Sequence, residues 1–191
     1  MTTIVVVRKG DSAVIAADSL TTFGTTRLAP AYDRSPQKVL HYRDSFIGVA
    51  GSAAHQLVLE NILERNANLD FAGRPAIYET FRKLHPVLKD EAFLNPKEEE
   101  DDPYESSQMT VMIANPSGIY AVYSMREVFE FDRFWAIGSG RDFALGAMYS
   151  VYGRAKSAAA IAEAGVLAGA EFDTGTAMPL NLHEVALMGS G

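Results

Sequence analysis

The sequence predicts an α+β fold in which two antiparallel sheets pack face to face between outer helices, forming a four-layer α/β/β/α sandwich. One observation is the order of elements: strands, two helices, strands, two helices and a final strand. A parallel βαβ alternation does not fit that order. The other is the opening, where β-branched runs at residues 2–8 and 12–18 flank a turn at 9–11. Such a pattern is typical of an antiparallel hairpin.

The remaining strands are predicted from short apolar runs that end at turn residues. We expect a pair at residues 37–42 and 45–50, joined by the turn Arg43-Asp44. The later strands are expected at residues 109–114, 119–123, 128–137 and 182–188.

Helices are predicted where the spacing between apolar residues changes from two residues to three or four residues. The first begins after Ser52, which can cap it, and has its apolar face within residues 57–63. The second runs from about residue 75 towards residue 93, and Pro86 should kink or interrupt it because proline lacks an amide donor. Two Ala-rich helices are expected at residues 142–152 and 157–170.

Composition narrows the class of protein. The 191 residues fit one domain, residues 1–191, with 48% hydrophobic and 21% charged residues. A net charge of -7 argues against nucleic-acid binding, which needs clustered Lys and Arg. No apolar run approaches the roughly 20 residues of a membrane span, and the start lacks a signal-peptide pattern. The absence of cysteine excludes thiol catalysis and disulfides, and we expect a cytoplasmic protein.

Thr2 is the first candidate for chemistry. It directly follows Met1, and a small second residue normally permits removal of the initiator Met. The new terminus would hold a hydroxyl and an α-amine on one residue, and that amine can activate the hydroxyl as a nucleophile. The reference pKa of an α-amine, about 7.7–8.0, suits a base at neutral pH. Many cytosolic proteins begin Met-Thr, so Thr2 alone does not decide the function.

Asp18 and Lys38 form a possible ion pair. Asp18 ends an apolar strand, where an acid commonly caps a turn, and Lys38 lies among residues of strand character, where a lysine commonly points to solvent. A lysine that points inward needs a carboxylate partner, because a buried unpaired charge is unfavourable. Asp18 is a candidate partner, and a lysine beside Thr2 would lower the pKa of the terminal amine.

Two glycine-containing turns lead from a strand into a helix. In residues 48–54, glycine permits close approach of the backbone to a substrate, and amides at a helix start can bind an oxyanion. A tight strand–helix junction is the alternative interpretation. Residues 136–141, Ala-Ile-Gly-Ser-Gly-Arg, suggest a dinucleotide loop, but Phe143 replaces the third glycine of that fingerprint. We therefore do not predict a nucleotide site.

Together these features resemble a proteasome β-type subunit. The strand-forming start, Asp18, Lys38, the Gly-x-Ala-Gly turn ending at Gly51 and the Ile-Gly-Ser-Gly turn around Ser139 follow in the family order at near-family spacing. The opening and short length are most similar to the bacterial HslV-type peptidases and the sporadic proteasome homologues of β-proteobacteria. The resemblance implies the N-terminal nucleophile hydrolase fold and extends to about residue 176.

The resemblance assigns roles residue by residue. It implies that Thr2 is the nucleophile and that Asp18 holds the catalytic Lys38, after a loop slightly longer than is usual. It implies that the Gly51 amide contributes to an oxyanion hole. Ser139 matches a serine that hydrogen-bonds near the terminal amine.

Two further assignments follow from the resemblance. Val49 and Ala53 match positions that line the first specificity pocket, which would make this pocket apolar. The family also has an Asp three residues before a Ser/Thr-Gly pair. If Thr174-Gly175 is that pair, the matching residue is Glu171, with Asp173 close by, so either acid can be the supporting one.

The implied function is a threonine endopeptidase that cleaves peptide bonds in unfolded proteins inside a homo-oligomeric double ring. No cofactor and no metal are expected. An unfolding ATPase is a possible partner, and neither nucleic acid nor membrane is expected as one. Two alternatives stay open: a catalytically silent ring subunit, and an N-terminal-nucleophile amidase that acts on a small molecule.

Overall fold

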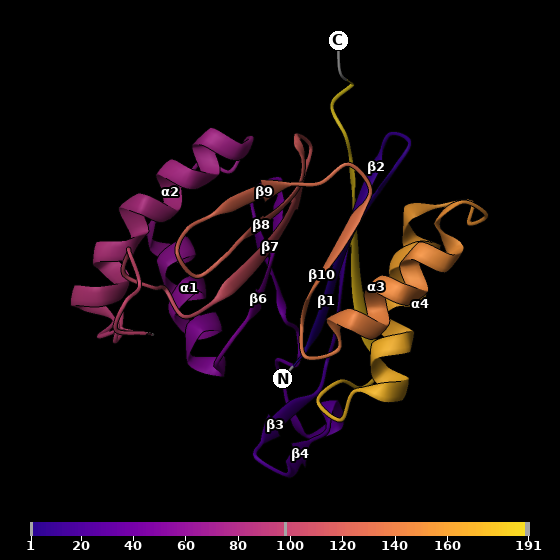
Figure 1. Cartoon of the computed structure of the whole chain (residues 1–191), viewed down its shortest axis with the longest axis horizontal. Helices are drawn as coiled ribbons and strands as arrows, with labels where there is room; N and C mark the ends of the chain where they lie inside the picture. Colours follow the sequence, from indigo (N-terminus) through magenta and orange to yellow (C-terminus); the bar gives the residue numbers. More distant parts are fainter. Residues whose placement is uncertain (1, 98, 190–191) are drawn as a thin grey trace.

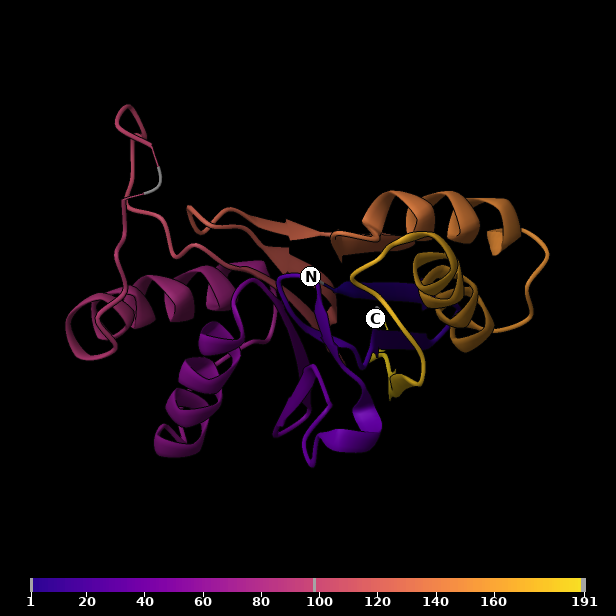
Figure 2. The same ribbon diagram turned by 90° about the horizontal axis from the view of Figure 1, so that it is seen from below.

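The structure, a computed structural model, describes residues 2–97 and 99–189 and has the predicted four-layer architecture (Figure 1). Two sheets lie at the centre, with a pair of helices on each outer face. Figure 2, a view from below, shows the two helical pairs at opposite ends of the long axis. Within the described part of the chain, no helix is long and apolar enough to cross a membrane.

The first sheet carries the beginning of the chain in its interior. All neighbouring strands are antiparallel. The order is β10 (Phe134–Gly138), β1 (Thr3–Lys9), β2 (Ser12–Asp18) and β11 (Leu180–Ala186).

The second sheet is also antiparallel throughout. Its order is β5 (Val39–Tyr42), β6 (Ser45–Ala50), β7 (Thr110–Asn115), β8 (Gly118–Val122) and β9 (Val128–Glu130). Apart from the run at residues 128–137, the predicted strands therefore form, with boundaries within two residues of those expected.

Four helices complete the layers, as the change in apolar spacing predicts. They are α1 (Ala53–Arg65) and α2 (Arg74–Pro86) beside the second sheet, and α3 (Arg141–Tyr152) and α4 (Ala158–Phe172) beside the first. Ser52 is the N-cap of α1, as expected. Pro86 ends α2, and a π-helical turn, Val87–Glu91, follows, so the predicted interruption at this proline is confirmed.

The strand β1 is buried on both faces, since Ile4, Val5, Val6 and Val7 are all 0% exposed. Side chains alternate between the faces of a strand, so successive residues enter different cores. Ile4 and Val6 belong to the core between the sheets, whereas Val5 and Val7 belong to the core beneath α3 and α4. The start of the chain is thus held in a rigid part of the molecule.

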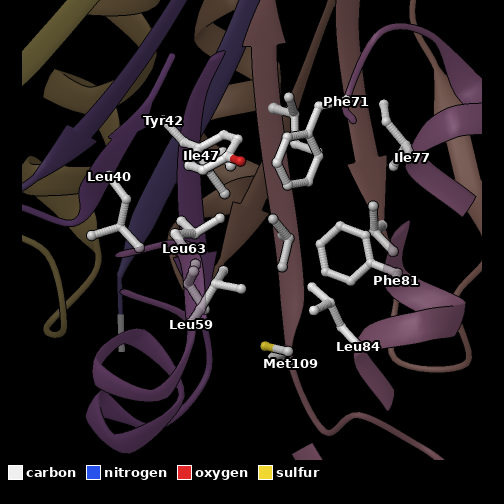
Figure 3. Close-up of a cluster of buried hydrophobic side chains, with 14 of the residues drawn as sticks. Leu40, Tyr42, Ile47, Leu59, Leu63, Phe71, Ile77, Phe81, Leu84 and Met109 are labelled. Carbon is white, nitrogen blue, oxygen red and sulfur yellow. The ribbon is translucent and has the colours of Figure 1, made fainter. Parts of the chain in front are cut away.

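A third core fills the space between the second sheet and its helices (Figure 3). Leu59 and Leu63 of α1 and Phe81 of α2 point towards the sheet from their separate helices. This core fixes α1, whose first turn lies beside the candidate site described below.

Two features differ from the sequence predictions. The strand expected at residues 128–137 is wrong as a single element, because β9 belongs to the second sheet and β10 to the first. Residues 131–133 carry the chain from one sheet to the other. The hairpin of β3 (Thr21–Phe23) and β4 (Thr26–Leu28) was not predicted. Its strands have only three residues each, too few for an alternating pattern to be recognised.

Candidate active site

The site is built around Thr2, immediately before β1. Its side-chain Oγ1 donates a hydrogen bond to Oδ1 of Asp18 over 2.8 Å. The antiparallel register pairs Ile4 with Ala17, which places the end of β2 beside the start of β1. Thr2 is 6% exposed. Met1, whose removal the hypothesis requires, lies outside the described residues.

The Asp18 carboxylate is fully buried and is the centre of a hydrogen-bond cluster. Because each donor stabilises the ionised form, the cluster compensates for the loss of water around the charge. Oδ1 accepts bonds from Thr2 Oγ1 and from the Thr3 amide and Lys38 Nζ, at 2.8, 3.0 and 2.8 Å, while Oδ2 accepts from the amides of Leu20 and Ala177 at 3.0 and 3.2 Å. The bond from Leu20, two residues on, also makes Asp18 the turn residue that its position suggests.

Lys38 points inward, not to solvent. It lies just before β5, is 8% exposed, and its Nζ forms an ion pair with Oδ1 of Asp18 at 2.8 Å. Burial lowers the pKa of Lys38, and attraction to Asp18 opposes this shift without cancelling it. The amine therefore gives up its proton more readily than an exposed lysine does.

A second cluster lies on the other side of Thr2. The Thr2 amide nitrogen is 3.2 Å from Oγ of Ser139, which donates to Oδ2 of Asp173 at 2.7 Å. The same carboxylate oxygen accepts from Oγ1 of Thr176 at 2.6 Å, and the Thr176 and Thr3 hydroxyl oxygens lie 2.7 Å apart. Hydrogen bonds thus connect Ser139 to Thr2 directly and to Thr3 through Asp173 and Thr176.

Of the two acids suggested by sequence, Asp173 lies in this cluster. Glu171 is an exposed residue of α4, and no hydrogen bond between described residues joins it to the site. Partial burial would raise the pKa of Asp173, but the bonds from Thr176, Ser139 and the Gly175 amide outweigh it and lower the pKa. The sequence reasoning missed Thr176; its spacing of three residues from Asp173 was the available signal.

A cavity of about 340 Å³ opens beside Thr2. Gly51 lies at the junction between β6 and α1, and Val49 and Ala53 flank it on those two elements. The structure therefore brings these three predicted residues to one cavity with Thr2. The remaining lining comes from Lys38, Leu20, the β3 residues Thr21, Thr22 and Phe23, and Ser35, Pro36, Gln37, Ser52 and Gln56.

A separate cavity of about 390 Å³ lies at the β5–β6 and β7–β8 turns and contains none of these residues. One of its buried polar residues, Asn115, donates to the carbonyl of Phe71 at 2.6 Å and accepts from the amide and hydroxyl of Ser117 at 2.9 and 2.6 Å. Because these bonds occupy the amide group, we assign Asn115 to the support of the turns.

Three glycines allow the start of β1 to sit deep in the site. A Cβ on Gly138, which has a φ of 91°, would overlap the carbonyl group of Thr2. A Cβ on Gly140 would overlap Oγ1 of Thr3, and one on Gly169 would come within 2.6 Å of the same atom. A side chain at any of them would displace Thr2 or Thr3.

The arrangement combines a hydroxyl, a buried carboxylate–lysine pair and a helix-start turn beside one cavity. Such a set can support acyl transfer, in which a hydroxyl attacks a carbonyl and backbone amides stabilise the oxyanion. Among residues 2–97 and 99–189, no group of three or more His, Asp or Glu side chains could hold a metal ion.

Comparison with known proteins identifies the family of this chain. The family model described as proteasome subunit matches residues 1–173. No curated protein matches the chain.

Solved structures are similar along the whole chain. Thiobacillus denitrificans BPH in complex with epoxomicin is 35% identical, with a TM-score of 0.91 over 98% of this chain and 100% of that one. Thiobacillus denitrificans BPH alone is 36% identical, with a TM-score of 0.91 over 97% and 98%. Eukaryotic HslV from Trypanosoma brucei is 21% identical, with a TM-score of 0.69 over 96% and 99%, and supports the fold alone. This chain therefore belongs to the proteasome subunit family, with the β-type, HslV-like fold of the N-terminal nucleophile hydrolases.

Proposed function

We propose that this chain is a threonine endopeptidase in which Thr2, exposed by removal of Met1, is the nucleophile. The observation that carries the proposal is the position of the Thr2 hydroxyl, 2.8 Å from Asp18 Oδ1 and beside a cavity that Lys38 and Gly51 also line. Membership of the proteasome family supports a peptidase of the N-terminal nucleophile type. The particular roles that follow are our assignments.

The proposed first step activates the hydroxyl. The α-amine of Thr2 accepts the proton of Oγ1, and Oγ1 attacks the peptide carbonyl. Lys38 favours this step because its positive charge stabilises the developing alkoxide and lowers the pKa of the amine. Asp18 holds Lys38 in place, and Ser139 hydrogen-bonds to the Thr2 nitrogen at 3.2 Å, which orients the amine.

The tetrahedral intermediate then collapses to an ester. The Gly51 amide donates to the oxyanion, and the ammonium formed in the first step protonates the leaving amine of the substrate. Water, activated by the same α-amine, hydrolyses the ester between Oγ1 and the acyl group and restores Thr2. In this scheme Asp173 acts indirectly, by accepting from Ser139 and Thr176.

The cavity supports a peptide substrate. Val49 and Ala53 contribute apolar surface near Thr2, so we expect preference for an apolar side chain before the scissile bond. The 35% identical BPH was solved in complex with epoxomicin, and we propose that epoxomicin binds this cavity too.

We further propose that the chain assembles as a homo-oligomeric double ring that admits unfolded polypeptides, in the cytoplasm. Closed rings of identical subunits are a common form of oligomer, and proteasome-family membership supports this one. An unfolding ATPase is the partner we would test. Native mass spectrometry should give twelve or fourteen protomers. A monomer in both low-salt and high-salt buffer would contradict the ring.

The central test compares wild type with Thr2→Ala. Intact mass should show loss of one Met from the wild type, and a fluorogenic peptide and an unfolded protein should both be cleaved. Thr2→Ala should fold and assemble but lose turnover, and epoxomicin should raise the thermal midpoint of the wild type more than that of the variant. Wild-type hydrolysis by Thr2→Ala would overturn the mechanism.

The same measurements separate the alternatives. A silent subunit would keep its fold and mass but cleave neither substrate after Met removal. A small-molecule amidase would hydrolyse simple amides while leaving the unfolded protein intact.

A further inference from the structure

An imidazole closes the first turn of α1, next to the proposed oxyanion donor. The Ser52 amide donates to Nδ1 of His55 at 3.2 Å, and the hydroxyl oxygen of Ser52 accepts from the Ala54 amide at 3.2 Å. These bonds form a capping box, in which position N3 commonly holds Glu or Gln. Here a residue that titrates near neutral pH holds that position.

The imidazole also packs against Gly51. A Cβ built on Gly51 would lie 3.0 Å from His55 Nδ1, so ring and backbone are in contact. Glycine has the greatest backbone freedom of any residue, and the Gly51 torsions set the angle between the two peptide planes that flank it. One plane carries the proposed oxyanion donor, the Gly51 amide. The other carries the Ser52 amide that His55 binds.

We propose that His55 is a positioning residue for the oxyanion hole. Its neutral imidazole holds the Ser52 amide and thereby aims the Gly51 amide, and its protonation releases the turn. The inference rests on the proposed peptidase function. It assigns a role to His55, which the reaction scheme does not use. It also gives a reason why turnover should be lost in acid.

The electrostatics agree with this geometry. Nδ1 accepts the bond, so it must carry no proton. Burial lowers the pKa of His55, and no charged group among the described residues contributes to that shift. The two atoms that lie nearest to a Cβ built on Gly51 after the ring, the Gln108 carbonyl oxygen and Met109 Cβ, are uncharged. The positive end of the α1 dipole further disfavours the imidazolium, and Lys38 is the cation that lines the same cavity as Gly51.

The direction of the pH effect follows. Because the pKa of folded His55 lies below the ordinary value of about 6.5, the imidazole is neutral at pH 7 and above. The imidazole becomes mostly protonated only when the pH falls below the pKa of folded His55, which is itself below the ordinary value. The hydrogen bond from the Ser52 amide to His55 Nδ1 is therefore present at neutral pH and lost in acid.

The test uses two variants of the full-length, assembled protein. His55→Ala removes the acceptor and should lower kcat about tenfold, less than the roughly 10²–10³ lost with an entire oxyanion donor, while KM stays within about twofold. His55→Gln keeps an acceptor that does not titrate. It should restore kcat to within about threefold of wild type at pH 8, and its activity should persist to lower pH.

Thermal midpoints and native mass show whether each variant is folded and assembled. The inference is overturned if folded His55→Ala has the kcat and pH profile of the wild type, or if His55→Gln neither restores kcat nor moves the acid limb. Thr2→Ala is assayed in parallel. If Thr2→Ala is inactive while His55→Ala equals the wild type, only the role of His55 fails. If Thr2→Ala is active, the proposed function itself fails.

Discussion

Two carboxylates, Asp18 and Glu105, each organise a cluster of hydrogen-bond donors, but in different surroundings. Asp18 is fully buried and pairs with Lys38. The side chain of Glu105 is 47% exposed and pairs with Lys89, and its Oε2 lies 3.0 Å from His85 Nε2. Arg126 donates to the Glu105 carbonyl at 2.6 Å, so this second cluster fastens the loop before β7 to α2 and to the β8–β9 turn.

The difference shows that burial determines how much the same chemical groups contribute to stability. At the surface, water replaces a lost partner, so an exposed pair contributes little. In the interior, replacing the carboxylate by an amide leaves some of the donors around Asp18 without an acceptor, and the buried lysine loses its ion-pair partner. We expect substitutions in the two clusters to differ sharply.

The largest effect is expected for Asp18→Asn. An amide cannot balance the charge of Lys38, and it turns its own NH₂ group towards donors. Breaking a buried pair in this way should lower the free energy of unfolding by about 3–5 kcal/mol. Turnover should fall roughly 10²–10⁴-fold. Urea unfolding and peptide hydrolysis measure the two losses, and a stability change as small as that of Glu105→Gln would contradict the comparison.

Lys38→Met sharpens the comparison. Turnover should fall over a similar range, roughly 10²–10⁴-fold, because the cation beside Thr2 is lost. The loss of stability should be smaller than for Asp18→Asn, since the carboxylate keeps its bonds from Thr2, Thr3, Leu20 and Ala177. Urea unfolding of both variants in one buffer tests the order, and a greater loss for Lys38→Met would reverse our assignment of the cluster's centre.

Asp173 provides an intermediate case with a pH signature. Its pKa is lowered in the folded state, so its stabilising contribution is present above the unfolded value of about 3.9 and is lost as the pH falls through the folded pKa. Asp173→Asn should therefore be less stable than wild type near neutrality and should approach it in strong acid. Free energies of unfolding along a pH series measure the gap. A gap that widens in acid would contradict the assigned direction.

The smallest effect is expected for Glu105→Gln. Hydrogen bonds from Lys89 and His85 lower the pKa of Glu105, but the pair is solvent-exposed and screened by salt. The urea midpoint should shift little at low salt and not measurably at high salt, and peptide turnover should match the wild type. A large, salt-independent loss would show that this cluster supports the fold as Asp18 does.

Residue type and position identified much of the candidate site. Asp18 and Lys38 were paired by a rule about buried charge: a lysine that points inward needs a nearby carboxylate. Gly51 and Ser52 were located because the apolar spacing changes there from strand to helix. The layered fold followed from the order of elements, which leaves few ways to bury each apolar face.

Other parts depended on tertiary structure. Glu171 and Asp173 differ by two positions at the end of α4, and only the packing of the following loop against β1 decides which acid meets Ser139. The single strand expected at residues 128–137 divides because β9 pairs with β8 in the second sheet, whereas β10 pairs with β1 in the first. His55 was not predicted as a site residue, because only the structure shows that its ring lies against the Gly51 turn.

The glycines beneath Thr2 and Thr3 have a practical consequence for engineering. Gly138, Gly140 and Gly169 leave no room for even one methyl group. In a mutagenesis library, almost any amino-acid change at these codons should yield an inactive clone, whatever selection is applied. A designer who wants a new cleavage preference should hold these three positions constant and vary Val49 and Ala53, where the wall of the cavity can change without moving the first residues of the chain.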